Sequence, residues 1–170
     1  AMKGYKVILV DADLRNPSTA KVLGMQEQEL GTLQVLKGEV KIEDAVQPYK
    51  DTSVMVLAGS SPIQDTSTVL SGENMRQFIK ELEAKADFVV IDTPPSAMLS
   101  DAAIVAQYVD GAVFVIRQDY TEADRILEGM EILSSSGAQI TGCILNDANV
   151  KGNSSEHYKN SYRLKGEVKV

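Results

Sequence analysis

Short apolar runs alternate with helical patterns along the first 150 residues, and this alternation constrains the fold more than any other feature of the chain. Runs that lack alternating polar positions are typical of strands buried on both faces, as in a parallel sheet covered by helices. The sequence therefore predicts an α/β fold with one mostly parallel sheet and helices on both faces. We expect its strands at residues 5–11, 53–58, 88–92, 112–117 and 140–146.

Helical patterns occupy the intervals between these runs. The clearest one carries an apolar stripe of Met75, Phe78, Ile79, Leu82 and Ala86, at the spacing of one helix face. Helices are predicted at 31–37, 42–46, 73–86, 101–108 and 121–133, the last with an N-cap at Thr121. After Val150 the pattern ends in a polar, tyrosine-bearing segment. We therefore expect an α/β domain over residues 1–150 and a flexible tail over 151–170.

The charge balance and apolar content limit the possible partners. The chain has 24 acidic and 17 basic residues, for a net charge of −7. This balance argues against a nucleic-acid partner, which requires a concentrated basic face. No apolar run approaches the roughly 20 residues of a membrane span, and no signal peptide is present, so we expect a cytoplasmic chain. The single Cys143 lies in an apolar strand and is expected to be a small core residue.

Two predicted strands end in acidic residues. The first is followed by the pattern D-x-D-x-R, formed by Asp11, Asp13 and Arg15. Two carboxylates at this spacing can face one hard cation or its bound waters. An Asx turn that leaves the strand, with Asp13 capping the segment that follows, would give the same pattern. The strand at 88–92 ends in Asp92 before Thr-Pro-Pro, as in a Walker B motif, or simply before a turn. Since parallel strands share a carboxyl edge, we expect Asp11 and Asp92 to lie close together there.

The two motifs together resemble those of the bacterial tyrosine autokinases of the capsule and exopolysaccharide type. These kinases are deviant-Walker P-loop proteins related to ParA and MinD. The supporting matches are weaker and fall at residues 31–39, 56–59, 101–102, 110–117 and 142–146. The resemblance covers nearly all of residues 1–150. It implies a P-loop NTPase-like fold that is truncated at its N terminus.

The resemblance implies a role for each motif residue in a kinase that uses ATP and Mg²⁺. Asp13 and Asp92 would hold the metal or its waters. Asp11 would accept or orient the tyrosine proton, although Asp11 and Asp13 could exchange roles. Arg15 would orient the site or pair across subunits. Asn146 would contact adenine through its amide, although a turn-forming role for it is equally compatible with its place at a strand end.

The resemblance also implies an acceptor and partners. Tyr158 and Tyr162 would receive the γ-phosphate, whereas without the resemblance they would simply be exposed residues of a disordered end. The expected partners are a membrane-anchored polysaccharide co-polymerase or activator and further copies of the kinase in a ring or other homo-oligomer. Such a partner would place the kinase at the inner face of the plasma membrane, where it would regulate polysaccharide synthesis and export.

The chain departs from the family pattern in three places. It contains no G-x-x-x-x-G-K-[ST] loop, which the family places upstream. In the family a helix follows that loop, and residues 1–4 are interpreted as the end of this helix. The proline-rich stretch of the family is replaced at residues 61–70, which puts the contacts of that loop in doubt. The tail also lacks a dense tyrosine cluster.

These departures lead to two expectations and leave two alternatives. The chain alone should bind MgATP weakly and have no kinase activity. A gap or open edge should separate the strands at 88–92 and 112–117, where the strand that feeds the phosphate loop would lie. The alternatives are a ParA/MinD-like ATPase, against which the Arg and Pro positions of the motifs argue, and a non-catalytic binding or regulatory remnant without a P-loop.

Overall fold

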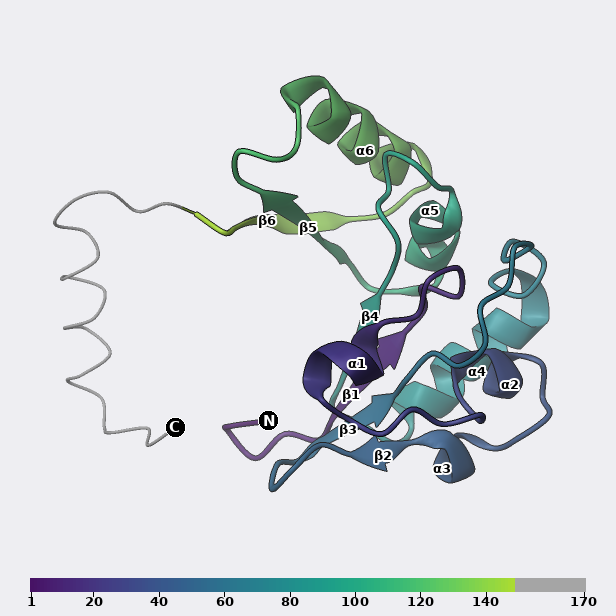
Figure 1. Cartoon of the computed structure of the whole chain (residues 1–170). Helices are drawn as coiled ribbons and strands as arrows, with labels where there is room; N and C mark the ends of the chain where they lie inside the picture. Colours follow the sequence, from purple (N-terminus) through teal and green to yellow (C-terminus); the bar gives the residue numbers. More distant parts are fainter. Residues whose placement is uncertain (149–170) are drawn as a thin grey trace, which may run out of the picture.

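The computed structural model describes residues 1–148 and has a mixed α/β architecture (Figure 1). Its strands are β1 (Val7–Asp11), β2 (Gln47–Pro48), β3 (Val54–Leu57), β4 (Phe88–Asp92), β5 (Ala112–Arg117) and β6 (Ile140–Asn146). Its helices are α1 (Thr19–Leu23), α2 (Thr32–Leu36), α3 (Ile42–Ala45), α4 (Gly72–Glu83), α5 (Asp101–Val105) and α6 (Ala123–Ser135), with the 3-10 helix η1 (Ala106–Tyr108) after α5. The α/β class and the five predicted strands are confirmed.

The strands form two sheets, so the prediction of a single sheet is wrong. The larger has the order β2-β3-β1-β4, and β1 runs parallel to both β3 and β4. The smaller is the parallel pair β5-β6. Among the described strands, β4 pairs only with β1 and β5 only with β6, which confirms the expected open edge between 88–92 and 112–117. The two sheets stay separate because no described strand lies between them.

Some short elements gave no usable pattern in the sequence. The two-residue strand β2, which pairs antiparallel with β3, and the five-residue helix α1 were not predicted. Residues 1–4 form a turn closed by the Gly4 N–H to the Ala1 carbonyl at 2.9 Å, and not the expected end of a helix. Helix α6 begins at Ala123 with Glu122 as its N-cap residue, two residues after the predicted start. Elements of one or two turns depend on tertiary packing more than on local sequence.

The main hydrophobic core lies beneath the larger sheet. Val10 of β1 and Leu57 of β3 are fully buried in the same cluster as Met75 and Leu82 of α4. These α4 residues belong to the apolar stripe that predicted the helix. On the other face, Ala20 of α1 packs in a smaller cluster with Val56 of β3. The larger sheet is therefore covered on both faces at β3, as a buried parallel sheet requires.

The smaller sheet is covered on one face by α5, η1 and α6. Ala102 and Ala106 form a cluster with Leu133 of α6, and Phe114 of β5 packs against it. Val105, the last residue of α5, belongs instead to the main core. Figure 1 shows α5 between the β5–β6 pair and the larger sheet. Helix α5 thus bridges the two cores.

Among residues 1–148, little covers one face of β4 and one face of β5. Phe88, Val90, Val113 and Val115 alternate along these strands and are each 51–59% exposed. We call these four residues the bare face. The Tyr5 ring packs edge-on against Phe88, with centroids 5.2 Å apart.

Cys143 is also exposed, which corrects the expectation of a core residue. The reason is its place on β6, a strand with a single partner and little cover among the described residues. An apolar strand pattern indicates the capacity for burial, and neighbouring elements decide whether burial is realised.

Candidate functional site

The predicted acidic residues meet at the carboxyl ends of β1 and β4. Asp11 and Asp92 are register partners on the two parallel strands. The next backbone bond, from the Ala12 N–H to the Asp92 carbonyl, is 2.8 Å long and continues the pairing. Asp13 follows two residues after Asp11. The expectation that Asp11 and Asp92 share one edge of the sheet is confirmed, and this edge is where open α/β sheets bind ligands.

The Asp11 carboxylate is buried and is occupied by backbone donors. It is 1% exposed. Its Oδ2 accepts the N–H groups of Ser18 and Thr19, both at 3.0 Å, at the beginning of α1. Its Oδ1 accepts the N–H of Asp13 at 3.1 Å. Asp11 therefore shapes the loop that follows β1 and caps α1 from a distance in sequence.

Gly59 permits the loop after β3 to pass close to Asp11. A Cβ atom on Gly59 would lie 2.2 Å from the Pro17 Cβ and 3.2 Å from the Asp11 Oδ2. No side chain fits into that space. The Ala-Gly pair at the end of this strand, noted in the sequence as a family match, thus has a steric reason in the structure.

Asp13 is half-buried, and one of its two carboxylate oxygens is available to a ligand. Its Oδ1 accepts the backbone N–H groups of Arg15 at 3.2 Å and Asn16 at 2.9 Å. Within residues 1–148 its Oδ2 accepts no hydrogen bond. The flanking Ala12 and Leu14 are buried, so the loop places Asp13 between two anchored positions. Asp13 therefore combines a defined position with a free carboxylate oxygen.

Asp92 lies in an unfavourable electrostatic environment. Partial burial of its carboxyl raises its pKa, and the negative charges of Asp11 and Asp13 raise it further, against one hydrogen bond from the Thr93 backbone that lowers it. Like charges gathered at one edge destabilise each other. A cation bound here would relieve that repulsion.

The Arg15 side chain donates hydrogen bonds to three other residues of the chain. Its Nε donates to the Asp101 Oδ2 at 2.7 Å, and its Nη2 donates to the Thr66 Oγ1 at 2.7 Å. Its Nη1 donates to the Gln64 carbonyl at 2.6 Å. The loop at residues 61–70, whose contacts the sequence left in doubt, therefore binds Arg15.

Asp101 and Thr66 are functional candidates that sequence reasoning missed. Both are fully buried, and the Thr66 hydroxyl donates to the Asp101 Oδ1 at 2.7 Å. Asp101 belongs to a family match in the sequence, but its partner Arg15 lies 86 residues away along the chain. Burial alone would raise the pKa of Asp101, yet hydrogen bonds from Arg15 and Thr66, together with the Arg15 charge, hold it below its usual value.

Asn146 lies apart from the carboxylates, at the end of β6. It is exposed, its Cα pairs with that of Arg117, and its carbonyl accepts the Gln118 N–H at 3.0 Å. A pocket opens beside it at the carboxyl ends of β5 and β6. The pocket is lined by Arg117, Gln118, Asp119, Tyr120, Asp147 and Ala148. Arg117 is held there by an ion pair with Asp147 at 3.1 Å and lies over the Tyr120 ring, 5.1 Å from its centroid.

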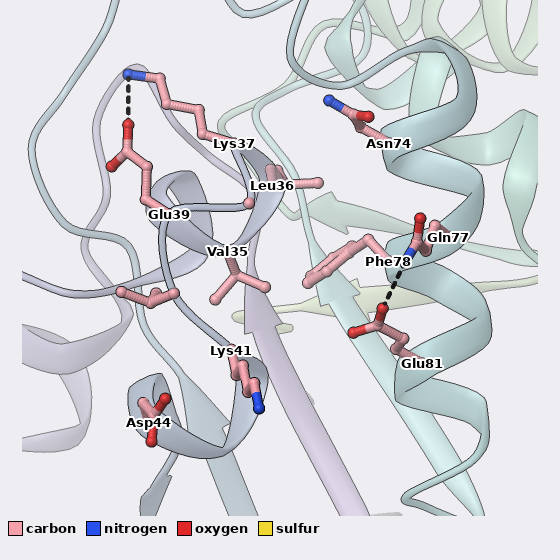
Figure 2. Close-up of a pocket in the computed structure, with 12 residues that line it drawn as sticks. Val35, Leu36, Lys37, Glu39, Lys41, Asp44, Asn74, Gln77, Phe78 and Glu81 are labelled. Atoms are coloured by element: carbon pink, nitrogen blue, oxygen red, sulfur yellow. Dashed lines mark hydrogen bonds and ion pairs between the residues drawn. The ribbon is translucent and has the colours of Figure 1, made fainter.

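A second concave region lies on another part of the surface. It is a groove between residues 35–44 and helix α4 (Figure 2). Phe78 points from α4 toward Val35, and polar side chains such as Lys37, Glu39 and Glu81 surround them. None of the predicted site residues lines this groove. The carboxylate edge and the pocket at β5–β6 are therefore the regions that the motifs select.

The carboxylates fit a magnesium ion better than a metal held only by protein. Within residues 1–148 no group of three or more His, Cys, Asp or Glu side chains is arranged to hold a metal ion. Mg²⁺ is usually bound by one or two carboxylates together with substrate phosphates and water. Asp13 and Asp92 supply such a pair.

Comparison with protein families identifies the fold. A ParA-type family model, described as NUBPL iron-transfer P-loop NTPase, matches residues 1–170. The chain belongs to the ParA-like P-loop NTPases. Membership of this family implies the use of a nucleotide and magnesium in general.

Comparison with individual proteins confirms the resemblance to bacterial tyrosine kinases. The tyrosine-protein kinase YwqD of Bacillus subtilis is 32% identical over 158 residues, which cover 93% of this chain and 66% of YwqD. The chain thus spans about two thirds of this relative. CpsD, the tyrosine-protein kinase of Streptococcus pneumoniae, is 26% identical over 153 residues, or 90% of this chain and 67% of CpsD.

Solved structures agree with this assignment. The VpsO kinase domain superposes with a TM-score of 0.79 at 30% identity, covering 86% of this chain and 72% of that domain. None of the helices described between residues 1 and 148 is long and apolar enough to cross a membrane.

Proposed function

We propose that this chain is the carboxylate-bearing part of an ATP-dependent protein-tyrosine autokinase of the capsule and exopolysaccharide type. The observation that carries the proposal is the meeting of Asp11, Asp13 and Asp92 at one strand edge, next to an open strand position between β4 and β5. Phosphoryl transfer mainly requires positioning and the stabilisation of charge, and both can be supplied at such an edge. The similarity to YwqD supports this choice of enzyme class.

Asp13 and Asp92 are the proposed metal-binding residues. The free oxygen of Asp13 and the partly buried carboxylate of Asp92 would bind Mg²⁺ directly or through its waters. Bound there, the ion would neutralise charge that develops on the transferred phosphoryl group. The pKa of Asp92 is raised first by partial burial and then by repulsion from Asp11 and Asp13, and a bound cation would relieve that repulsion.

The contacts of Asp11 favour a different role from the one first expected for it. Both of its oxygens accept backbone N–H groups, and the side chain is buried. A hydroxyl group that arrives from solvent therefore finds no accessible oxygen on Asp11. We therefore assign the orientation of the tyrosine hydroxyl to Asp13, and the support of the Asp13 loop to Asp11. The two roles had been left interchangeable by the sequence.

The nucleobase would lie at the carboxyl ends of β5 and β6. Asn146 has an amide with both a donor and an acceptor, which suits a base edge. The neighbouring Tyr120 and Arg117 offer flat surfaces for stacking. In this proposal the base would lie on the smaller sheet and the phosphates on the larger one.

The acceptor tyrosines and the partners are further parts of the proposal. Tyr158 and Tyr162 lie outside the described residues, and we propose them as phosphate acceptors because of the family resemblance. A membrane-anchored polysaccharide co-polymerase or activator, and further copies of the kinase, are the proposed partners.

We propose that a strand leading into a glycine-rich phosphate loop would occupy the open position between β4 and β5. A parallel strand there would pair with both free edges and join the two sheets. A helix following that strand would cover the bare face, where four apolar side chains are more than half exposed. Without such a loop the phosphates lack a backbone nest and a lysine.

The test compares this chain with a chimera in which the strand, phosphate loop and helix of YwqD precede residue 1. Calorimetric titration with MgATP should show very weak binding by the 170-residue chain and clear binding by the chimera. Mass spectrometry of the chimera after incubation with MgATP should then find phosphate on Tyr158 and Tyr162. Phosphate confined to Tyr5, Tyr49, Tyr108 or Tyr120 would contradict the acceptor assignment.

Three other outcomes would change the proposal. Tight binding of MgATP by the 170-residue chain would show that its nucleotide site does not require the phosphate loop. A chimera that hydrolyses ATP without phosphorylating tyrosine would favour a ParA/MinD-like ATPase. A chimera that folds but does not bind ATP would favour a non-catalytic binding module.

A further inference from the structure

The polar network around Arg15 uses every nitrogen of its guanidinium group. All three nitrogens of its guanidinium group donate within the chain, to Asp101, Thr66 and the Gln64 carbonyl. The contact with Asp101 is bidentate, because Nη2 also donates to the Asp101 Oδ1 at 3.3 Å. Such a planar fork is specific for arginine.

The network is anchored at buried positions. The Asp101 side chain is 1% exposed, while that of Arg15 is 32% exposed. The Thr66 hydroxyl both accepts from Arg15 and donates to Asp101, which completes a closed set of hydrogen bonds. A backbone bond from the Ile63 N–H to the Leu14 carbonyl, at 2.8 Å, fastens the same two loops together. A buried charge held by several partners strongly resists displacement.

The network connects directly to the proposed metal-binding residue. The Arg15 N–H donates to the Asp13 Oδ1 at 3.2 Å, so the backbone of Arg15 orients the Asp13 carboxylate. Its side chain fixes that backbone to Asp101, the first residue of α5. Release of the side chain would free the loop between Asp13 and the beginning of α1.

We propose that Arg15 is a positioning residue, which holds Asp13 at the carboxylate edge through Asp101 and Thr66 and does not itself contact the phosphates. This inference deepens the proposed function and rests on it for the role of Asp13. It gives the first of the two roles expected for Arg15, the orientation of the site, a defined set of contacts. A movement of α5, which bridges the two sheets, would be passed to Asp13 along the same path.

The order of the loop around Asp13 tests the proposal in the 170-residue chain, without any activity assay. The Asn16 N–H donates to the Asp13 Oδ1 at 2.9 Å, so hydrogen exchange at this amide reports whether the loop holds Asp13 in place. NMR measures this exchange residue by residue. The variants are Arg15→Ala, Arg15→Lys and Thr66→Val, with Arg125→Ala as a control. Arg125 is exposed and pairs with Glu128 at 2.7 Å on α6.

The two explanations predict different results. If the Arg15 side chain positions Asp13 through its hydrogen bonds, its loss lets the loop open, and the Asn16 amide exchanges faster. If Arg15 acts only through its positive charge, Arg15→Lys keeps that charge and should leave the exchange at Asn16 as in the wild type. We expect Arg15→Lys to behave like Arg15→Ala, because an ammonium group cannot make the bidentate contact. Thr66→Val should cause a smaller increase in exchange, and Arg125→Ala none.

A second readout is the binding of Mg²⁺ alone, followed through the amide signals of residues 11–16. Each variant that speeds the exchange at Asn16 should also need a higher Mg²⁺ concentration for half-saturation. A wild-type exchange rate at Asn16 in Arg15→Ala or in Arg15→Lys would overturn the proposal. If Arg15→Ala does not fold, the results for Arg15→Lys and Thr66→Val decide. Failure of the chimera to act as a kinase would leave these measurements unaffected, so the two proposals fail separately.

Discussion

The two sheets of this molecule arise from similar apolar segments yet differ greatly in burial. Val10 of β1 is completely buried, whereas Val115 of β5 is 59% exposed. β1 has a strand on each side and helices over its faces, while β5 has one strand partner and one covered face among the described elements. The comparison shows that an apolar run defines a strand, and that the neighbouring elements define its stability.

The difference also divides the candidate site. The carboxylates lie at the end of the well-packed sheet, where the hydrogen bonds to Asp11 give them a defined geometry. Asn146 and its pocket lie on the more exposed pair. A strand inserted between β4 and β5 would bring these halves into one sheet. The difference in packing therefore shows that the carboxylate half of the candidate site already has a defined geometry.

The largest expected difference between the two sheets comes from matched truncations. Leu57→Ala in β3 removes a fully buried side chain and should lower the free energy of unfolding by about 2–5 kcal/mol. Leu145→Ala in β6 removes one that is 55% exposed and should change it by less than about 0.5 kcal/mol. Urea unfolding followed by circular dichroism measures both. Equal losses would mean that β6 is covered in solution.

Much of this fold could be predicted because its longer elements carry strong patterns. The stripe on α4 and the strand runs ending in Asp11 and Asp92 were sufficient to predict the α/β class and the shared edge. The division into two sheets could not be predicted from local patterns, because strand pairing depends on which elements are present to pair.

The candidate site was only partly predictable for a similar reason. The three aspartates and Arg15 stand in short motifs, so the sequence identified them. Their contacts did not follow, since Arg15 and Asp101 are far apart along the chain and Thr66 lies in a loop without a motif. Likewise, the burial of Asp11 is a consequence of how α1 packs, and α1 was too short to be recognised.

The next largest effect concerns the polar link between the larger sheet and α5. Asp101→Asn removes the charge that pairs with Arg15 and should cost about 1.5–3 kcal/mol at pH 7, since hydrogen bonds to charged groups are the strong ones. The folded-state pKa of Asp101 is lowered, so its contribution is present above the unfolded pKa and is lost as the pH falls through the folded pKa. The wild type and the variant should therefore converge in acid. A constant difference from pH 7 to pH 2, measured by urea unfolding, would contradict this.

A somewhat smaller effect is expected where α6 packs on the β5–β6 pair. A Cβ on Gly129 would lie 2.8 Å from the Ser96 Oγ and 3.1 Å from the Phe114 Cζ. Gly129→Val should therefore crowd this contact and cost about 1–3 kcal/mol. NMR spectra should show the changes in β5 and α6 and leave β1 and β3 unchanged. Gly142→Ala is the control, because a Cβ there meets no atom within 4 Å.

The smallest expected effect has the opposite sign and occurs at the junction of the two halves. Asp92 has a raised folded-state pKa, through burial and the charges of Asp11 and Asp13. Its charged form therefore destabilises the folded chain, and the penalty grows as the pH rises through the folded pKa. Asp92→Asn should slightly raise the thermal midpoint at pH 7, with no change below the unfolded pKa. Added Mg²⁺ should stabilise the wild type more than the variant, since the variant lacks one of the two proposed ligands. Asp110→Asn, an exposed change on the loop before β5, is the control and should leave both measurements unchanged. Destabilisation by Asp92→Asn at pH 7 without metal would mean that Asp92 supports the fold, and that the repulsion at this edge is not the mark of a cation site.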